Sequence, residues 1–154
     1  SQHTREAHGA GAVVLFNRFV QPYIDLDTLA LSDLHLLSGP SERLLAMRWI
    51  SLLYGRLGLK LAGSGGVFTW QDSVKMLLSG ADVVNLTSAL LHHGPQRLTE
   101  IRNGIEAWMD EKQFARLADF RGRLSQQATA DTSALTREGY VMLLDNYAAP
   151  TEAA

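Results

Sequence analysis

Residues 59–91 constrain the fold more than any other stretch of this 154-residue sequence. A first apolar run ends in Gly63-Ser64-Gly65-Gly66, an amphipathic segment spans residues 70–78, and a second apolar run, residues 83–86, ends in Thr87-Ser88. This order predicts a strand, a glycine-rich turn, a helix and a second strand. Strand–helix alternation is typical of a parallel sheet with right-handed crossovers, so the pattern indicates an α/β fold.

The sequence before this stretch extends the pattern. Residues 12–16 are continuously apolar and β-branched, which predicts a strand buried on both faces, and residues 1–9 resemble the tail of a helix. A long connection then contains two runs of strand length, residues 23–26 and 34–37, that could form a hairpin. The next helix is expected over residues 41–54, with Ser41 as N-cap, and the strand after it over residues 59–62.

The sequence after this stretch predicts mainly helices. Either Thr69 or Asp72 opens the helix that ends near Ser79. Further helices are expected over residues 88–92, 95–109 and 110–125, then a polar linker over 126–133 and a last short helix over 136–147. We therefore expect a first unit of β/α repeats over residues 1–127, followed over residues 128–154 by a linker, a short helix and a tail.

Composition excludes several classes of protein. A net charge of −2 gives no support for a nucleic-acid or anionic-membrane partner. The absence of cysteine excludes disulfides, thiolate metal sites and a cysteine nucleophile. No apolar run approaches the roughly 20 residues that span a bilayer, no metal-ligand spacing is present, and residues 1–16 lack signal-peptide order. We expect no metal, no membrane span and a cytoplasmic location.

The two turns at the strand ends are suited to an anion. Gly65 and Gly66 can present backbone N–H groups because no Cβ blocks the approach. Thr87 and Ser88 add hydroxyl groups and a helix start. The alternative is that the glycines only form a tight turn. Two such turns on consecutive strands favour a phosphate site.

Three other residues are candidates for ligand contact. Asn17 follows a buried strand, so its amide could bind a ligand carbonyl or ring nitrogen, or could only cap the loop. Gly39, within Ser38-Gly39-Pro40, could bring the backbone close to a ligand or simply begin a helix. Arg18 could pair with an anionic substrate, or on the surface with Asp25 or Asp27.

Several stretches of the sequence match one known family. They are AGAVVLFNRF, LSGPSERLLAMRWI, GSGGVFTWQDSVKMLLSGADVV, TSALLHHGP and TREGYVMLLDNY, and together they cover most of residues 9–147. In these stretches the chain resembles the C-terminal half of dihydroorotate dehydrogenase-like proteins, which are FMN-binding (β/α)₈ barrels. The resemblance implies the C-terminal half of a TIM-type barrel with extra C-terminal helices.

The resemblance also implies roles for individual residues. Gly65, Gly66, Thr87 and Ser88 would hold the FMN phosphate, and Gly39 would lie near the flavin. Asn17 would lie in the pyrimidine or flavin pocket and is taken as the substrate-binding residue. Thr87-Ser88 departs from the family's usual Gly-Thr pair at the second turn. The flavin-contacting lysine and the catalytic base belong to the family's N-terminal half, so no catalytic residue is assigned here.

The implied activity is oxidation of dihydroorotate, or a related small molecule, by hydride transfer to flavin in pyrimidine biosynthesis. We expect the chain alone to turn over weakly or not at all, and to pair with a complementary N-terminal half-barrel or with a second copy of itself. Two alternatives stay open. One is a non-catalytic half-barrel that binds phosphate or flavin or serves in assembly. The other is a sugar-phosphate isomerase or aldolase barrel.

Overall fold

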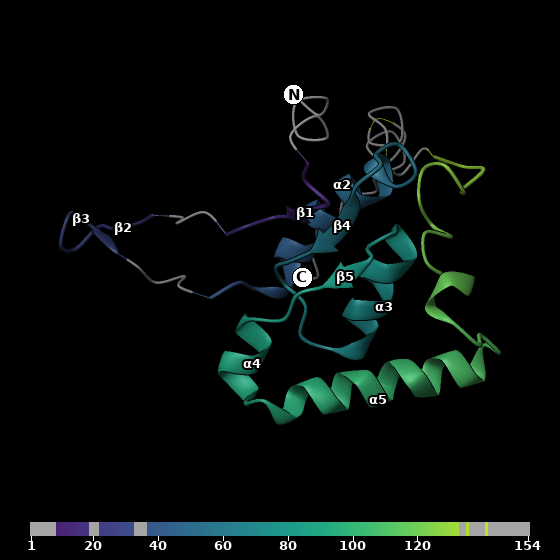
Figure 1. Cartoon of the computed structure of the whole chain (residues 1–154). Coiled ribbons are helices and arrows are strands. Elements are labelled where there is room, and N and C mark those ends of the chain that lie inside the picture. The colour runs from purple at the N-terminus through teal and green to yellow at the C-terminus, as the bar shows by residue number, and fades with distance from the viewer. Residues whose placement is uncertain (1–8, 19–21, 33–36, 133–134, 136–140, 142–154) are drawn as a thin grey trace, which may run out of the picture.

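A computed structural model shows an α/β arrangement around a small parallel sheet (Figure 1). The structure describes residues 9–18, 22–32, 37–132, 135 and 141. The sheet strands are β1 (Ala12–Leu15), β4 (Lys60–Gly63) and β5 (Val83–Val84), and the hairpin strands are β2 (Tyr23–Asp25) and β3 (Ala30–Ser32). The helical elements are η1 (Pro40–Glu42), α2 (Arg43–Leu53), α3 (Trp70–Ser79), α4 (Ser88–His93), α5 (Gln96–Glu111) and η2 (Leu117–Asp119).

The sheet has the order β1-β4-β5, and both pairings are parallel, as the strand–helix alternation predicts. Ala12 pairs with Lys60 in the first pairing, and Ala62 pairs with Val83 in the second. The carboxyl ends of all three strands therefore lie at one edge of the sheet, because parallel strands share a direction.

Helices α2 and α3 cover the sheet and bury its core. Ile50 of α2 and Met76 of α3 have no exposed surface, and they pack with Leu15 and Leu61 of the sheet. Deletion of a buried side chain of this size typically costs about 2–5 kcal/mol. Each of these buried side chains is therefore expected to contribute substantially to the stability of the described part of the chain.

A capping box starts α3. The Thr69 hydroxyl accepts from the Asp72 N–H at 3.2 Å, and the Asp72 carboxylate accepts from the Thr69 N–H at 3.1 Å. Thr69 and Asp72, the two residues that the sequence offers as alternatives for opening this helix, thus act together. This reciprocal pairing satisfies backbone N–H groups that a helix start leaves without partners.

Several boundaries differ from the predicted ones. Ser41 is not an N-cap, because η1 begins at Pro40 after its N-cap Gly39 and leads directly into α2. The strand β5 is shorter than the predicted 83–86. The second hairpin strand is Ala30–Ser32 rather than 34–37, and most of the latter range lies outside the described residues. The predicted helix over 136–147 also lies outside the described residues, apart from Val141. So does the predicted helix tail over residues 1–9, apart from Gly9.

The predicted helix over residues 110–125 is wrong. Helix α5 continues to Glu111, and the chain then forms turns around η2. The backbone after η2 instead forms hydrogen bonds to α3 and α2. The Gly122 N–H donates to the Leu77 carbonyl at 2.9 Å, and the Gln126 N–H donates to the Ser51 carbonyl at 3.0 Å. Two apolar residues of this stretch, Phe114 and Phe120, form an aromatic cluster with Trp108 of α5, in which the rings of Trp108 and Phe120 lie 5.0 Å apart edge to face.

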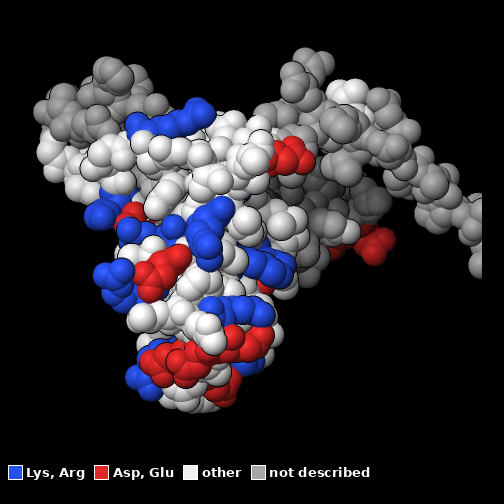
Figure 2. Space-filling view, turned by 90° about the vertical axis from the view of Figure 1, so that its right-hand side faces the viewer, with Lys and Arg blue, Asp and Glu red and all other residues white. Residues whose placement is uncertain are grey.

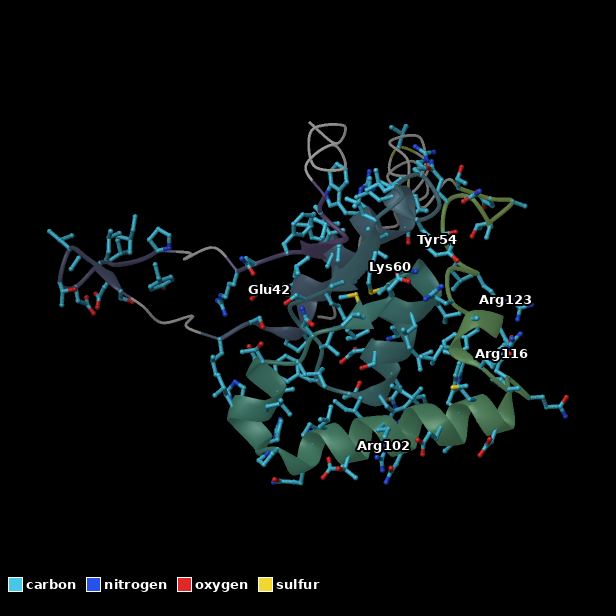
Figure 3. All side chains as sticks on the ribbon, viewed as in Figure 1. Glu42, Tyr54, Lys60, Arg102, Arg116 and Arg123 are labelled. Carbon is cyan, nitrogen blue, oxygen red and sulfur yellow. The ribbon has the colours of Figure 1, made fainter. Side chains whose placement is uncertain are left out.

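An ion network ties the amino-terminal edge of the sheet together. Asp82 Oδ1 lies 2.8 Å from Arg121 Nη1 and 3.3 Å from Lys60 Nζ. Its other oxygen accepts from the Leu61 backbone N–H at 2.9 Å. Figure 3 places Lys60, at the start of β4, apart from Glu42 of η1, which lines a cavity at the other end of the strands. The network therefore joins β4, the turn before β5 and the segment after α5, away from the glycine-rich turn.

We expect Asp82→Asn to lower the free energy of unfolding by about 1–3 kcal/mol. The amide can still accept from Leu61, but it loses the charge that holds Arg121 and Lys60. Urea unfolding followed by circular dichroism measures the change. Glu106→Gln is the control, because Glu106 is 65% exposed and 3.7 Å from Arg102, and it should change stability by less than about 0.5 kcal/mol. Equal effects of the two substitutions would contradict this role of Asp82.

Candidate cofactor and substrate site

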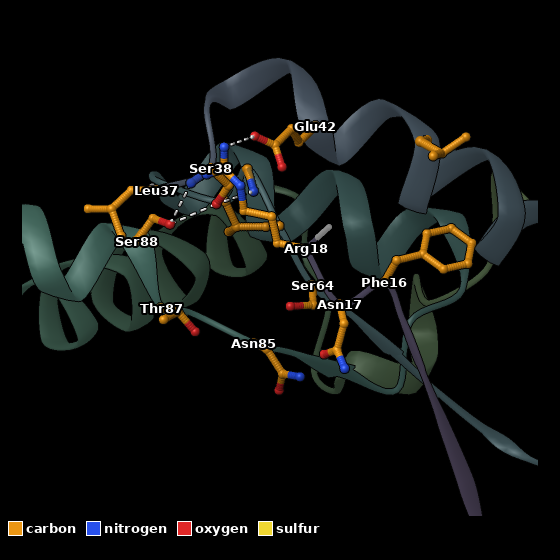
Figure 4. A pocket seen from close by; sticks show the side chains of 14 residues that line it. Phe16, Asn17, Arg18, Leu37, Ser38, Glu42, Ser64, Asn85, Thr87 and Ser88 are labelled. Atoms are coloured by element: carbon orange, nitrogen blue, oxygen red, sulfur yellow. Dashed lines mark hydrogen bonds and ion pairs between the residues drawn. The ribbon is translucent and has the colours of Figure 1, made fainter. Parts of the chain in front are cut away.

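A cavity of about 540 Å³ opens at the carboxyl ends of the three sheet strands. This volume is in the range of small-molecule and cofactor sites. Figure 4 shows the side chains that surround it. The lining residues are Phe16, Asn17, Arg18, Leu37, Ser38, Glu42, Leu45, Ser64, Gly65, Gly66, Val67, Asn85, Thr87 and Ser88.

Backbone hydrogen bonds just beyond the strands position the cavity floor. The Ser64 N–H donates to the Leu15 carbonyl at 2.8 Å, and the Asn85 N–H donates to the Gly63 carbonyl at 2.8 Å. These bonds extend the parallel ladders past the strand ends. The side chains of Asn17, Ser64 and Asn85, one after each strand, consequently line the same cavity (Figure 4).

The two glycines of the turn after β4 have different surroundings. Gly66 has φ +69°, and a Cβ there would lie 2.6 Å from the Arg43 backbone nitrogen and 2.8 Å from the Gly39 carbonyl oxygen. Gly65 has φ +92°, and the nearest atom to its Cβ position is Glu42 Cβ at 4.0 Å. Gly66 is therefore required for packing against the start of α2, whereas Gly65 borders open space in the cavity.

Ser38 and Ser88 join the two walls of the cavity. The Ser38 N–H donates to Ser88 Oγ at 3.0 Å, and the two hydroxyl oxygens lie 2.7 Å apart. The Gly66 N–H points toward Ser38 Oγ at 3.4 Å. The Ser88 hydroxyl thus already has a protein partner, and the loop before η1 is held against the start of α4.

Arg18 and Glu42 are the charged residues of the cavity lining. Arg18 Nη2 lies 3.8 Å from Glu42 Oε1, and the same oxygen accepts from the Gly39 N–H at 2.9 Å. Arg18 Nη1 is buried and has no hydrogen-bond partner among the described residues. Pairing of Arg18 with Asp25 or Asp27, the surface alternative, is wrong, since Glu42 takes that place.

The structure brings together six of the seven residues that the sequence singles out as binding candidates. All six line the cavity: Asn17, Arg18, Gly65, Gly66, Thr87 and Ser88. Gly39 lies behind the wall: its N–H is bonded to Glu42, and its carbonyl packs beside Gly66.

Sequence reasoning missed four polar residues of the lining. Ser64 and Asn85 directly follow the observed strands β4 and β5, but the predicted strands end at residues 62 and 86, so Asn85 falls inside a predicted strand and Ser64 inside the glycine-rich turn. The signal that could have found them is a polar side chain at a strand end, as for Asn17. The Ser38 hydroxyl and the Glu42 carboxylate carried no such signal, since their place depends on how the loop before α2 folds back.

The carboxyl groups with shifted pKa values lie outside the cavity. Hydrogen bonds from the backbone N–H groups of Thr28 and Asp27 lower the pKa of Asp25, and one from the Arg116 N–H lowers the pKa of Asp119. Within the described ranges, there is no cluster of three or more metal-ligating side chains and no helix long and apolar enough to cross a membrane. Figure 2 shows Lys and Arg interspersed with Asp and Glu on the face in view.

Residues 4–109 match the family model described as dihydroorotate dehydrogenase. The chain belongs to the dihydroorotate dehydrogenase family. The catalytic subunit of dihydroorotate dehydrogenase B (NAD(+)) from Saccharolobus solfataricus is 34% identical over 107 residues, which are 68% of this chain and 37% of that protein. The same subunit from Caldicellulosiruptor saccharolyticus is 26% identical over 123 residues, which are 78% of this chain and 41% of that protein.

Solved structures agree at the level of the fold. DHODH from Eimeria tenella, crystallised with ferulenol, superposes with a TM-score of 0.62 at 17% identity and covers 79% of this chain and 33% of that one. The chain thus spans less than half the length of these family members. The expected α/β fold, built as part of a dihydroorotate dehydrogenase-type barrel, is confirmed. The division of the chain at residue 127 stays a prediction.

We expect Gly66→Ala to destabilise the protein more than Gly65→Ala. A positive φ costs a non-glycine residue about 1–2 kcal/mol at either position, and only at Gly66 does the new Cβ also collide with backbone atoms, which adds about 1–3 kcal/mol. Thermal unfolding of both variants, compared with the wild-type protein, measures the difference. A Gly66→Ala variant as stable as Gly65→Ala would show that the turn does not pack against α2 in this way.

Proposed function

We propose that this chain forms the phosphate-binding part of an FMN-dependent oxidoreductase of the dihydroorotate dehydrogenase type, which oxidises dihydroorotate or a related small molecule in pyrimidine biosynthesis. The observation that carries the proposal is the cavity at the strand carboxyl ends, where ligands bind in parallel α/β barrels. Its lining includes the turns after β4 and β5 together, within a family whose members are dihydroorotate dehydrogenases.

The lining residues fit the phosphate end of FMN. The space beside Gly65 leaves room for an anion to approach the backbone N–H groups of this turn. Thr87 is exposed at the start of α4, so its hydroxyl is available to the same group, and Ser88 contributes its backbone N–H while its hydroxyl supports Ser38. Gly66 contributes mainly by holding the turn against α2, as the crowding around it indicates.

Asn17 is proposed to bind the substrate. Its side chain lines the cavity after β1, where an amide can both donate to and accept from a planar ring with carbonyl and N–H groups. Asn85, which lines the cavity after β5, offers the same chemistry from the other side. Gly39 is proposed to be the turn residue that brings Ser38 to the cavity wall near the flavin.

A bound flavin supplies the hydride acceptor, and the residues of this chain position it. The turns after β4 and β5 would fix the phosphate, and the amides of Asn17 and Asn85 would orient the substrate. We assign no proton-transferring base to this chain. We propose that the remaining part of the barrel, supplied by a complementary half or replaced by a second copy of the chain, completes the site.

Substitution of Gly65 tests the phosphate placement. We expect Gly65→Asp to weaken FMN binding at least about tenfold relative to Gly65→Asn, because two like charges about 4 Å apart near a protein surface repel by several kcal/mol and tenfold corresponds to about 1.4 kcal/mol. Asparagine is the matched control for size and for the positive φ. Quenching of flavin fluorescence during titration measures the affinity.

Riboflavin, which lacks the phosphate, provides the second control. Its affinity should be the same for both variants. Equal FMN affinity of Gly65→Asp and Gly65→Asn would place the phosphate elsewhere. Failure of the wild-type chain to bind either flavin would instead count against the proposed function as a whole.

A further inference from the structure

The guanidinium of Arg18 is the unexplained group in the cavity. Arg18 follows Asn17 at the end of β1, and its side chain is only 22% exposed. The Nη1 atom is buried without a hydrogen-bond partner among the residues that the structure describes. A buried donor without a partner costs free energy, more so when it is charged. Such a group in a cavity wall indicates a missing acceptor.

The ion pair with Glu42 does not satisfy this guanidinium. The separation of 3.8 Å between Arg18 Nη2 and Glu42 Oε1 is too long for a charge-assisted hydrogen bond, which typically measures about 2.7–2.9 Å. Glu42 Oε1 is engaged more closely by the Gly39 N–H, at 2.9 Å. Glu42 is therefore held by the backbone before α2, whereas Arg18 is only loosely attached to it and its Nη1 donor has no partner among the described residues.

We propose that Arg18 is an oxyanion-recognition residue of the cavity, which binds a carboxylate or phosphate group of the bound molecule and is held near its place by Glu42 until that group arrives. The planar guanidinium presents paired N–H donors that match the two oxygens of such a group. This inference rests on the proposed function in that the same cavity receives the ligand. It adds a specificity residue that recognises the charge of the bound molecule from the loop after β1.

The charges around Arg18 determine how strongly an oxyanion is attracted. The cavity lining contains one guanidinium and one carboxylate, so their net charge is zero. Removal of the Glu42 charge should leave Arg18 as the unopposed positive group. Glu42→Gln keeps an oxygen that can accept from the Gly39 N–H, so the turn before η1 retains its bond. Opposite effects of substitutions at the two partners are therefore the signature of the proposed role.

The test measures four ligands against the full chain and three variants. FMN is compared with riboflavin, which lacks the phosphate, and orotate with uracil, which lacks the carboxylate. We expect Arg18→Gln to weaken binding of FMN or of orotate about tenfold or more. The affinity for the matching ligand without the anionic group, riboflavin or uracil, should stay unchanged. Glu42→Gln should strengthen binding of that same oxyanion. Arg102 lies on the outer side of α5 with a side chain 66% exposed (Figure 3). Arg102→Gln should therefore change the affinity for none of the four ligands.

The affected pair identifies the source of the oxyanion. An effect on FMN but not riboflavin assigns Arg18 to the cofactor phosphate, and an effect on orotate but not uracil assigns it to the substrate carboxylate. The inference would be overturned if Arg18→Gln left both affinity ratios unchanged, that of FMN to riboflavin and that of orotate to uracil. Loss of affinity for all four ligands alike would also overturn it, because that result indicates a purely structural residue.

A measurement on the wild-type chain separates this inference from the proposed function. The NMR signal of the Arg18 Nε–H group is followed while inorganic phosphate or orotate is added, without flavin. A saturable shift supports the inference even if FMN fails to bind, in which case only the proposed function fails. No shift with either anion, in a chain that binds FMN, would overturn the inference and leave the proposed function intact.

Discussion

The parallel ladder that continues past the ends of β1, β4 and β5 is the constraint on which the site depends. The Ser64 and Asn85 N–H groups donate to carbonyls of the neighbouring strands just beyond the last paired residues. These bonds fix the position along each strand at which the following loop leaves the sheet. Since the three strands share one direction, the polar residues that follow them meet around a single cavity.

The start of α2 is built around the same turn. The backbones of Gly39 and Arg43 approach Gly66 too closely for a side chain, so the glycine-rich turn serves packing as well as ligand access. Arg43 also pairs with Asp72 at 3.1 Å, which links this start to the capping box of α3. The cavity wall is thus attached to both helices that bury the core, and a rigid wall of this kind preorganises the groups that face a ligand.

Much of this arrangement could be predicted from the sequence, for identifiable reasons. The strands and the helices α2 and α3 could be predicted because apolar runs bounded by glycines indicate them. The position of Gly65, Gly66, Thr87 and Ser88 at the strand ends could be predicted because they belong to the turns that follow two of these strands. Residues 114–126 could not be predicted: their spacing resembles a helix, but Phe120 is buried in an aromatic cluster and the backbone bonds to α2 and α3. The Arg18–Glu42 pair depends on a loop that no local pattern specifies.

We propose that the cavity at the strand ends holds FMN by its phosphate. The most direct test is the visible absorption spectrum of the purified chain after incubation with FMN and removal of free flavin by gel filtration, with riboflavin treated in parallel. We expect a flavin band to elute with the protein after incubation with FMN and to be much weaker after incubation with riboflavin. A colourless protein fraction after FMN, or equal retention of both flavins, would contradict binding through the phosphate.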